Sequence, residues 1–441
     1  MRLPLVAIVG RPNVGKSTLF NRLTASRLAI VEATPGVTRD RLYHRCEWGK
    51  HAFVLVDTGG IDTGLDDPIA EQTRRQAELA VREADVIIFV VDGRDGLLPA
   101  DEEVAELLRT SRKPVLLAVN KGEGQRPDTV KADFYVLGLG EPVVISAAHG
   151  LGTGDLLDEV VAYFPPAGKD LEDPAQTRVA VVGRPNVGKS SLVNAVLGEE
   201  RVITSDLPGT TRDAIDTPFV RNGRNYVIVD TAGIRRRSSV KEAVERYSVL
   251  RAVKAISRAD VVLMVLDATA GVTDQDRRIA GLGHEAGRAT IIVVNKWDLV
   301  EKDEHTLAQY TKRLRAELAF LDYAPLIFVS AKSGKRVPQL VDLMEYVAEQ
   351  QSRRIQTSHL NEVVSDAVTR HEPPSDKGRA LKIFYATQAS VRPPTFVFFV
   401  NDPDLFHFSY QRYLENRLRE AYGFEGTPLV LKARPKGERA D

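Results

Sequence analysis

The stretch Gly10-Arg-Pro-Asn-Val-Gly15-Lys16-Ser17 decides the fold of the first part of this 441-residue chain. It directly follows the apolar run Leu5–Val9 and matches GxxxxGK[ST], the pattern of the phosphate-binding loop, or P-loop. In that motif a strand leads into a loop whose backbone N–H groups cradle phosphates, and a helix follows. Side chains at the glycine positions would block this close approach. The stretch therefore predicts a strand–loop–helix unit that binds a phosphorylated ligand.

The same stretch returns as Gly183-Arg-Pro-Asn-Val-Gly188-Lys189-Ser190, at an offset of 173 residues. That offset also relates Thr38-Arg39-Asp40 to Thr211-Arg212-Asp213, and Asp57-Thr58-Gly59-Gly60 to Asp230-Thr231-Ala232-Gly233. Solenoid repeats have periods of roughly 20–50 residues, so this repeat indicates a duplicated domain. We refer to its two halves as the first copy and the second copy.

Short apolar runs alternate with amphipathic segments in each copy. In the first copy the predicted strands are Leu5–Val9, Phe53–Val56, Val86–Val91, Val115–Val119 and Val143–Ile145, and Glu71–Ala84 and Glu102–Arg109 are predicted helices. Near-continuous apolar strands between helices indicate an α/β domain with a mostly parallel, doubly wound sheet. We predict such domains over residues 1–166 and 177–351, joined by a linker over residues 167–176.

The pattern changes after the second copy. The sequence predicts a helix over Leu360–Val368, strands over Leu381–Ala386 and Thr395–Val400, a long helix over Tyr410–Tyr422 and a last strand over Leu429–Lys432. Hairpin-linked strands are antiparallel, so they cannot extend a parallel sheet. Residues 352–441 are therefore predicted to form a small, separate α+β domain.

The residues around the two glycine loops fit the binding of nucleotide phosphates. The two P-loop lysines are expected to reach the β- and γ-phosphates, and the hydroxyl and carboxylate groups nearby are expected to hold Mg²⁺. The predicted Mg²⁺ ligands are Ser17, Thr38, Asp57, Ser190, Thr211 and Asp230, and the predicted catalytic residues are Lys16, Thr38, Lys189 and Thr211.

A later loop in the second copy identifies the base. Asn295-Lys296-Trp297-Asp298 follows the apolar run Ile291–Val294, and the Asp298 carboxylate can accept hydrogen bonds from guanine N1–H and the guanine amino group. Adenine lacks both donors, and hydrogen bonds to charged groups are worth roughly 1.5–3 kcal/mol each. Ser330-Ala331-Lys332 is expected to place N–H groups near the guanine carbonyl. These features are typical of GTPases.

The first copy departs from this pattern. Its base loop is Asn120-Lys121-Gly122-Glu123, with Glu in place of Asp, and Ser146-Ala147-Ala148 follows later. The extra methylene moves the carboxylate by about a bond length, and Gly122 can let the loop adjust. Guanine selectivity is predicted for both copies and is weaker for the first.

Neither DxxG motif is followed by the glutamine that orients the attacking water in many GTPases. Ile61 and Ile234 occupy that position and cannot orient water. Two interpretations remain open: hydrolysis relies on another group or ion, or the copies bind GTP and hardly turn it over.

The predicted nucleotide contacts form matching sets in the two copies. In the first they are Gly10, Arg11, Pro12, Asn13, Val14, Gly15, Lys16, Ser17, Asp57, Thr58, Gly59, Gly60, Ile61, Asn120, Lys121, Glu123 and Ser146. In the second they are Gly183, Arg184, Pro185, Asn186, Val187, Gly188, Lys189, Ser190, Asp230, Thr231, Ala232, Gly233, Ile234, Asn295, Lys296, Asp298 and Ser330.

Composition narrows the possible environments and partners. Lys+Arg and Asp+Glu balance at 60 each, so no global field draws the chain to nucleic acid or membrane. The single cysteine, Cys46, excludes an intramolecular disulfide and fits a reducing compartment. No apolar run reaches the roughly 18 residues that span a bilayer. We expect a cytoplasmic protein without stable membrane association.

The tandem GRPNVGKS loops, the switches TPGVTRD and LPGTTRD and the small C-terminal domain resemble the Der (EngA) family of double Era-like GTPases. The resemblance covers essentially the whole chain. It implies two P-loop GTPase domains followed by a KH-like domain, and a bacterial factor that hydrolyses GTP in maturation of the large (50S) ribosomal subunit. It also implies potassium-stimulated hydrolysis, with Asn13 and Asn186 helping to hold K⁺. The partners expected are the large subunit, its rRNA and ribosomal proteins, and the chain itself is expected to be a monomer.

Two other functions stay open beside this one. A nucleotide kinase is disfavoured by the Asn-Lys-Xaa-Asp loop. A GTPase partner of a tRNA-modifying enzyme, as in the TrmE group, is disfavoured because that group ends in a catalytic cysteine and this chain has only Cys46. Gly423-Phe424-Glu425-Gly426 matches the GxxG clamp of KH modules, but it follows a long helix, so Gly423 is predicted to be a helix C-cap instead. Arg235-Arg236-Arg237 forms either a solvated loop or a contact with RNA phosphates.

Overall fold

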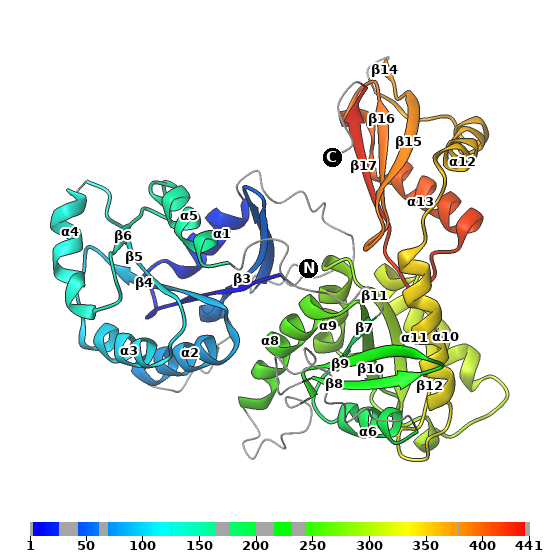
Figure 1. Ribbon diagram of the computed structural model, residues 1–441, viewed down its shortest axis with the longest axis horizontal. Helices are drawn as coiled ribbons and strands as arrows, with labels where there is room; N and C mark the ends of the chain where they lie inside the picture. The colour runs from blue at the N-terminus through cyan, green and yellow to red at the C-terminus, as the bar shows by residue number, and fades with distance from the viewer. Residues whose placement is uncertain are drawn as a thin grey trace. The chain divides into compact units, whose positions relative to one another are not determined.

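The computed structural model describes residues 3–25, 43–60, 69–124, 126–164, 176–199, 216–231, 243–376 and 379–436. Its contacts divide the chain into two units (Figure 1). One unit is built mainly on the first copy and includes residues 240–257, and the other contains most of the second copy together with the C-terminal domain. Within the described ranges, no helix is long and apolar enough to cross a membrane. The predicted linker lies almost wholly outside them.

Six strands form the sheet of the first copy, in the order β2-β3-β1-β4-β5-β6. They are β1 (Leu5–Val9), β2 (Tyr43–Trp48), β3 (His51–Asp57), β4 (Val86–Asp92), β5 (Val115–Asn120) and β6 (Val143–Val144). Neighbouring strands are parallel, except that β2 pairs with β3 in an antiparallel hairpin. The apolar runs predicted every strand but β2, whose sequence YHRCEW mixes polar and apolar residues.

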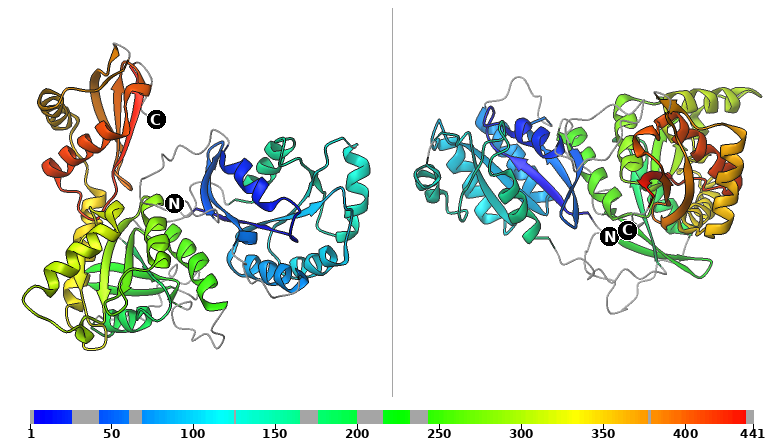
Figure 2. Two further views of the ribbon diagram at one scale, coloured as in Figure 1. Left: turned by 180° about the vertical axis from the view of Figure 1, so that it is seen from behind. Right: turned by 90° about the horizontal axis from the view of Figure 1, so that it is seen from above.

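Helices cover both faces of this sheet (Figure 2). They are α1 (Lys16–Ala25), α2 (Ile69–Glu83), α3 (Pro99–Thr110), α4 (Pro127–Phe134) and α5 (Thr153–Ala162), with 3-10 turns η1 (Thr58–Gly60) and η2 (Tyr135–Leu137). Alternate residues of β1 belong to opposite core layers. Val6 and Ile8 share a cluster with residues of α1 and α5, whereas Ala7 and Val9 share one with residues of α2 and α3. Both faces are buried, which explains the continuous apolar strands.

The second copy repeats this architecture. Its strands are β7 (Gln176–Val182), β8 (Thr217–Arg221), β9 (Arg224–Val229), β10 (Val261–Asp267), β11 (Ala289–Asn295) and β12 (Leu326–Phe328). Their order, β8-β9-β7-β10-β11-β12, matches that of the first copy strand for strand. The helices and 3-10 turns are α6 (Lys189–Glu199), α8 (Ala243–Arg258), α9 (Asp274–Glu285), α10 (Thr306–Glu317), α11 (Val337–Ser352), η3 (Trp297–Leu299) and η4 (Ala319–Leu321). The fold-class prediction for the two copies is confirmed.

The C-terminal domain has its own three-stranded sheet, β15-β16-β17. It comprises α12 (Thr357–Arg370), a short pair β13 (Ser375–Asp376) and β14 (Arg379–Ala380), β15 (Ile383–Ser390), β16 (Thr395–Val400), η5 (Pro403–Leu405), α13 (Phe408–Tyr422) and β17 (Val430–Pro435). β15 and β16 are antiparallel, and β16 and β17 are parallel. Phe396, Phe398 and Phe424 lie in its buried core. The predicted α+β organisation is therefore correct.

The GxxG-like segment ends α13 and contacts the second copy. Gly423 caps the helix with a φ of 84°, and its N–H donates to the Arg419 carbonyl (2.8 Å). Gly426 then forms two backbone hydrogen bonds, accepting from Thr290 N–H (2.6 Å) and donating to the Tyr323 carbonyl (2.8 Å). The prediction of a helix C-cap is confirmed, and the segment holds the C-terminal domain against the second copy.

Candidate nucleotide-binding sites

Each P-loop wraps closely around the asparagine of its base loop. Gly15 has a φ of 98°, and a Cβ there would lie 2.2 Å from Asn120 Nδ2. Gly188, with a φ of 94°, has the same relation to Asn295 Nδ2. Only glycine tolerates both the left-handed backbone and this contact.

The two asparagines tie three predicted loops together. Asn120 Nδ2 donates to the Val14 carbonyl (2.7 Å), and Asn120 Oδ1 accepts from Ala147 N–H (2.9 Å). Asn295 forms the equivalent bonds to Val187 (2.9 Å) and Ala331 (3.0 Å). The structure thus brings the P-loop, the base loop and the Ser-Ala loop of each copy to one place.

The P-loop lysines lie deep in these loops. Lys16 Nζ donates to the carbonyls of Gly10 (2.6 Å) and Arg11 (2.9 Å), and Lys189 Nζ makes the equivalent bonds at 2.8 and 2.7 Å. Burial lowers the pKa of each ammonium to about 8, even though Asp57 acts to raise that of Lys16. The negative charge of a bound phosphate would favour the protonated form of each lysine and raise its pKa again.

Two of the three predicted Mg²⁺ ligands of the first copy, Ser17 and Asp57, meet directly. Ser17 Oγ donates to Asp57 Oδ2 (2.6 Å), and the other carboxylate oxygen accepts from Gly59 N–H (2.9 Å). Thr58 bonds to the Ile8 carbonyl (2.6 Å) and so fixes the start of η1. Hydroxyl and carboxylate oxygens are the ligands that Mg²⁺ prefers, so the Ser17 and Asp57 side chains fit this ion.

In the corresponding region of the second copy, Asp216 contacts the predicted Mg²⁺ ligand Asp230. Asp230 has a left-handed φ of 57°, and its N–H donates to Asp216 Oδ1 (3.0 Å). Arg258 pairs with the other oxygen of Asp216 (2.5 Å). The remaining predicted residues lie outside the described ranges. They are Thr38, Ile61, Thr211, Ala232, Gly233 and Ile234, together with the basic run Arg235–Arg237.

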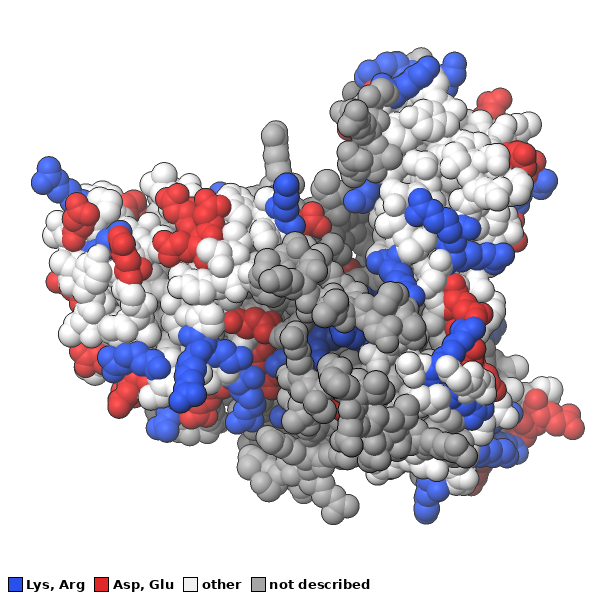
Figure 3. All heavy atoms as spheres, viewed as in Figure 1, with Lys and Arg blue, Asp and Glu red and all other residues white. Residues whose placement is uncertain are grey.

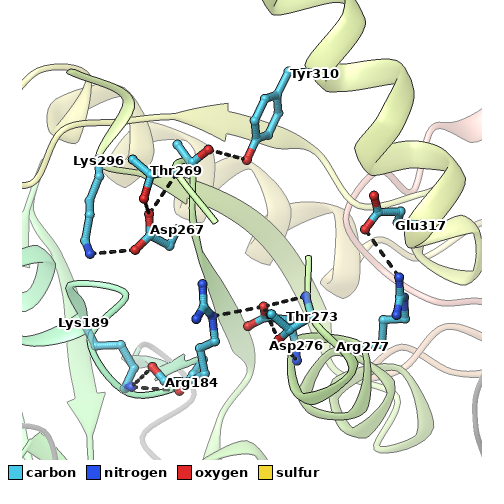
Figure 4. Close-up of polar contacts among 12 residues, drawn as sticks. Arg184, Lys189, Asp267, Thr269, Thr273, Asp276, Arg277, Lys296, Tyr310 and Glu317 are labelled. Carbon is cyan, nitrogen blue, oxygen red and sulfur yellow. Dashed lines mark hydrogen bonds and ion pairs between the residues drawn. The ribbon is translucent and has the colours of Figure 1, made fainter. Parts of the chain in front are cut away.

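A carboxylate that the sequence did not single out holds the base-loop lysine in each copy. Lys296 Nζ pairs with Asp267 at the end of β10 (2.6 Å), and Thr269 donates to the same carboxylate through its N–H (2.9 Å) and hydroxyl (2.7 Å), as Figure 4 shows. In the first copy Lys121 pairs with Asp92 (2.5 Å) and also donates to the Asn13 carbonyl (2.9 Å). Burial acts to raise the pKa of these two aspartates, but the lysines and nearby N–H groups outweigh it and lower the pKa.

A second buried carboxylate holds the P-loop arginine. Arg184 Nε lies 3.3 Å from Asp276, which is completely buried and forms a capping box with Thr273 at the start of α9 (Figure 4). Arg11 contacts Asp101 of α3 in the same way (3.4 Å) and also Asp95 (3.0 Å). Each P-loop is therefore linked through its arginine to one helix of its copy, α3 in the first copy and α9 in the second.

The internal repeat contains a signal for these missed residues. Asp92 aligns with Asp267, and Asp101 with Asp276, but at an offset of 175 residues rather than 173. The base-loop asparagines share that offset of 175. Realigning the copies after the DxxG motif would have marked both aspartates as repeated carboxylates beside the P-loop.

The acidic residues of the two base loops have different surroundings. Glu123 is mostly buried and forms an ion pair with Arg94, whereas Asp298 is exposed. The Ser146 hydroxyl and the Glu123 N–H lie close enough, together with Arg94, to lower the pKa of Glu123. Ser330 has the same effect on the pKa of Asp298, supported by Lys332. Both carboxylates are thus ionised acceptors suited to the donors on guanine.

Two glycine loops with asparagine-lysine base loops, each on a doubly wound sheet, define a tandem P-loop GTPase. The family described as "50S ribosome-binding GTPase" matches residues 5–121 and 178–296, and the family described as "KH-domain-like of EngA bacterial GTPase enzymes, C-terminal" matches residues 354–434. The chain belongs to the Der (EngA) family of GTPases. It binds guanine nucleotides and hydrolyses GTP.

Full-length relatives support this assignment. The protein named GTPase Der from Pelotomaculum thermopropionicum is 60% identical over 442 residues, and that from Moorella thermoacetica is 61% identical over 441 residues. Each alignment covers 100% of both chains. GTPase Der from Geobacillus kaustophilus is 58% identical and covers 99% of this chain and 100% of its own. A solved structure of Era from Aquifex aeolicus is 20% identical, covers 78% of this chain and 99% of its own, and has a TM-score of 0.30.

Proposed function

We propose that this GTPase is a nucleotide-driven switch that acts in the cytoplasm, as a monomer, during maturation of the large (50S) ribosomal subunit. The observation that carries the proposal is that both copies match a family described by 50S ribosome binding, with an EngA-type domain after them. Its working parts are two GTPase domains over residues 1–166 and 177–351, the linker over residues 167–176 and the KH-like domain over residues 352–441.

Mg²⁺ is the metal of both copies in this proposal. Ser17 and Asp57 would hold it in the first copy, and Ser190 and Asp230 in the second, with Thr38 and Thr211 as the switch ligands. When bound, the ion neutralises charge on the β- and γ-phosphates. Lys16 and Lys189 would donate to the same phosphates. These hydrogen bonds would replace those that the two ammonium groups donate to backbone carbonyls in the structure.

K⁺ takes the place of the missing glutamine in this proposal. Asn13 and Asn186 would help to hold it, and both are exposed with left-handed φ values of 69° and 65°. Asparagine tolerates this backbone better than most residues, and its amide oxygen is a suitable ligand. The bond from Lys121 to the Asn13 carbonyl supports this by fixing the backbone there.

The KH-like domain offers a surface suited to rRNA. We define the aromatic patch as Phe384, Tyr385, Lys382 and Lys436. Phe384 and Tyr385 are 37% and 41% exposed, and the two lysine Nζ atoms lie 5.6 and 4.7 Å from the Phe384 ring centroid. Exposed rings stack with bases, and nearby lysines contact phosphates. On the face in Figure 3, basic and acidic groups are otherwise interspersed, so RNA binding depends on such local groups.

Co-sedimentation with purified ribosomal subunits tests this function. The full chain is mixed with 30S or 50S subunits in the presence of GDP, GTP or a non-hydrolysable GTP analogue. We expect binding to 50S subunits with the analogue and little binding with GDP. Phe384→Ala should weaken that binding, whereas Phe408→Ala, which removes another exposed phenylalanine, should not. Equal binding in all three nucleotides, or binding to 30S alone, would refute the proposal.

A further inference from the structure

Arg94 connects two loops of the first copy. It lies between β4 and α3, where its N–H donates to Asp92 Oδ1 (3.0 Å), so its backbone is fixed to the carboxylate that also holds Lys121. Its guanidinium extends to the base loop, and Nη2 donates to Glu123 Oε1. The Arg94 side chain is 59% exposed and that of Glu123 is 23% exposed. The pair therefore lies at the edge of the base site.

The two oxygens of Glu123 are not equivalent. Oε1 is occupied by Arg94, whereas Oε2 is buried and has no hydrogen-bond partner among the residues that the structure describes. The Ser146 hydroxyl, itself buried, lies beside the carboxylate and lowers the pKa of Glu123. Because a buried acceptor that is not fully hydrogen-bonded is unfavourable, a further donor to Oε2 would stabilise it. Guanine supplies donors at this position.

The sequence of the second copy has no arginine at the position of Arg94, so this ion pair cannot form there. The residue that aligns with Arg94 is Thr269, whose hydroxyl donates to Asp267 (2.7 Å). Thr269 carries no charge, and its side chain is too short to act as a counter-ion across the loop. Asp298 is exposed, and Ser330 lies beside it as Ser146 lies beside Glu123, so the arginine on the carboxylate is what distinguishes the first copy.

We propose that Arg94 determines the purine selectivity of the first nucleotide site. By occupying Oε1, it leaves one carboxylate oxygen for the two donors of guanine, N1–H and the exocyclic amine. One oxygen shared by two donors binds each of them less well than two oxygens do. The exocyclic amine therefore contributes less to binding in the first copy than in the second.

Inosine triphosphate (ITP) is the probe for this inference, because it keeps N1–H and the ring carbonyl of GTP and lacks only the amine. Kd values for GTP and ITP are measured by calorimetry on full chains with one working site, using Lys189→Ala to isolate the first and Lys16→Ala to isolate the second. We expect the ITP/GTP ratio of Kd values to be about tenfold smaller at the first site than at the second. A tenfold change corresponds to about one hydrogen bond to a charged group.

Three substitutions in the Lys189→Ala chain identify the cause. Arg94→Thr frees Oε1 and should raise the ITP/GTP ratio about tenfold, toward that of the second site. Arg94→Lys keeps a cation on the carboxylate and should leave the ratio near its original value. Lys131→Thr removes a different ion pair of the same domain, the 2.6 Å contact with Glu141, and should not change the ratio.

Two outcomes would overturn the inference. Equal ITP/GTP ratios in Arg94→Thr and the unchanged first site would show that the ion pair does not limit recognition of the amine. Weaker binding of GTP and ITP by the same factor in Arg94→Thr would show that Arg94 contacts the nucleotide itself. Arg94 is largely exposed, so we expect unchanged unfolding temperatures, and these verify that each variant is folded.

Discussion

The two copies share the contacts that hold the phosphate loop and differ in those that face the base. Asn120 and Asn295 make the same pair of hydrogen bonds to the P-loop and the Ser-Ala loop, within about 0.2 Å. The acidic residues differ in length, exposure and counter-ion, because Glu123 is paired with Arg94 and Asp298 is exposed. Phosphate binding depends on backbone geometry that admits few solutions, whereas a base can be read by more than one arrangement of a carboxylate.

The strongest test of the shared part is removal of the two asparagines. Asn120→Ala and Asn295→Ala each leave one buried carbonyl and one buried N–H unpaired. At about 1–3 kcal/mol for each group, nucleotide affinity at the altered site should fall roughly 100-fold, and equally in both copies. Calorimetry on the single-site chains measures this. Asn416→Ala, on the exposed face of α13, is the control. A large loss in one copy alone would refute the shared architecture.

The next test makes the first copy resemble the second. Glu123→Asp in the Lys189→Ala chain retracts the carboxylate from Arg94 and lets both oxygens meet guanine. We expect GTP to bind about tenfold more tightly and the preference over ATP to widen. Titration with both nucleotides checks this. Unchanged affinity would mean that Gly122 already adjusts the loop to the longer side chain.

A third test asks whether the copies share a cation requirement. If K⁺ replaces the missing glutamine, GTP hydrolysis should rise severalfold when Na⁺ is exchanged for K⁺ at constant ionic strength. Asn186→Ala should flatten this dependence in the second copy, and Asn13→Ala in the first, with phosphate release measured on single-site chains. Equal rates in the two salts would exclude the ion as the substitute.

Motifs within one short segment could be read directly from the sequence. Gly10–Ser17 and Leu5–Val9 predicted a strand, loop and helix because their chemistry is local, and β1 and α1 begin where expected. The mostly parallel, doubly wound sheet also followed, because near-continuous apolar strands alternate with helices along the chain. β2 was missed because its alternating polar residues, typical of an edge strand, resemble a loop.

Pairs formed across long separations could not be predicted in this way. Lys296 and Asp267 are 29 residues apart, as are Arg94 and Glu123, and their meeting depends on the parallel pairing of neighbouring strands. That pairing aligns Asp92 with Asn120 and Asp267 with Asn295. Once the strand register is known, the base loop of the first copy lies beside the loop that follows β4, and that of the second copy lies beside the loop that follows β10. The sequence shows the residues but not this register.

The smallest expected effect is a dependence on pH that the two copies should share. Burial lowers the pKa of Lys16 and of Lys189 to about 8, from an ordinary value of 10.5. Phosphate binding needs the ammonium form, so GTP affinity should weaken as pH rises through 8, by about fourfold between pH 7 and pH 8.5. The free energy of unfolding should instead increase with pH. Between about pH 8 and 10.5 the folded state binds fewer protons at these lysines than the unfolded state does. The cost of burying the two ammonium groups is therefore present below pH 8 and is relieved as pH rises. Calorimetric titrations of Lys189→Ala and Lys16→Ala chains at the two pH values measure the affinity at each site. A fall at one site only would show that the two lysines lie in different electrostatic environments, despite their matching carbonyl contacts.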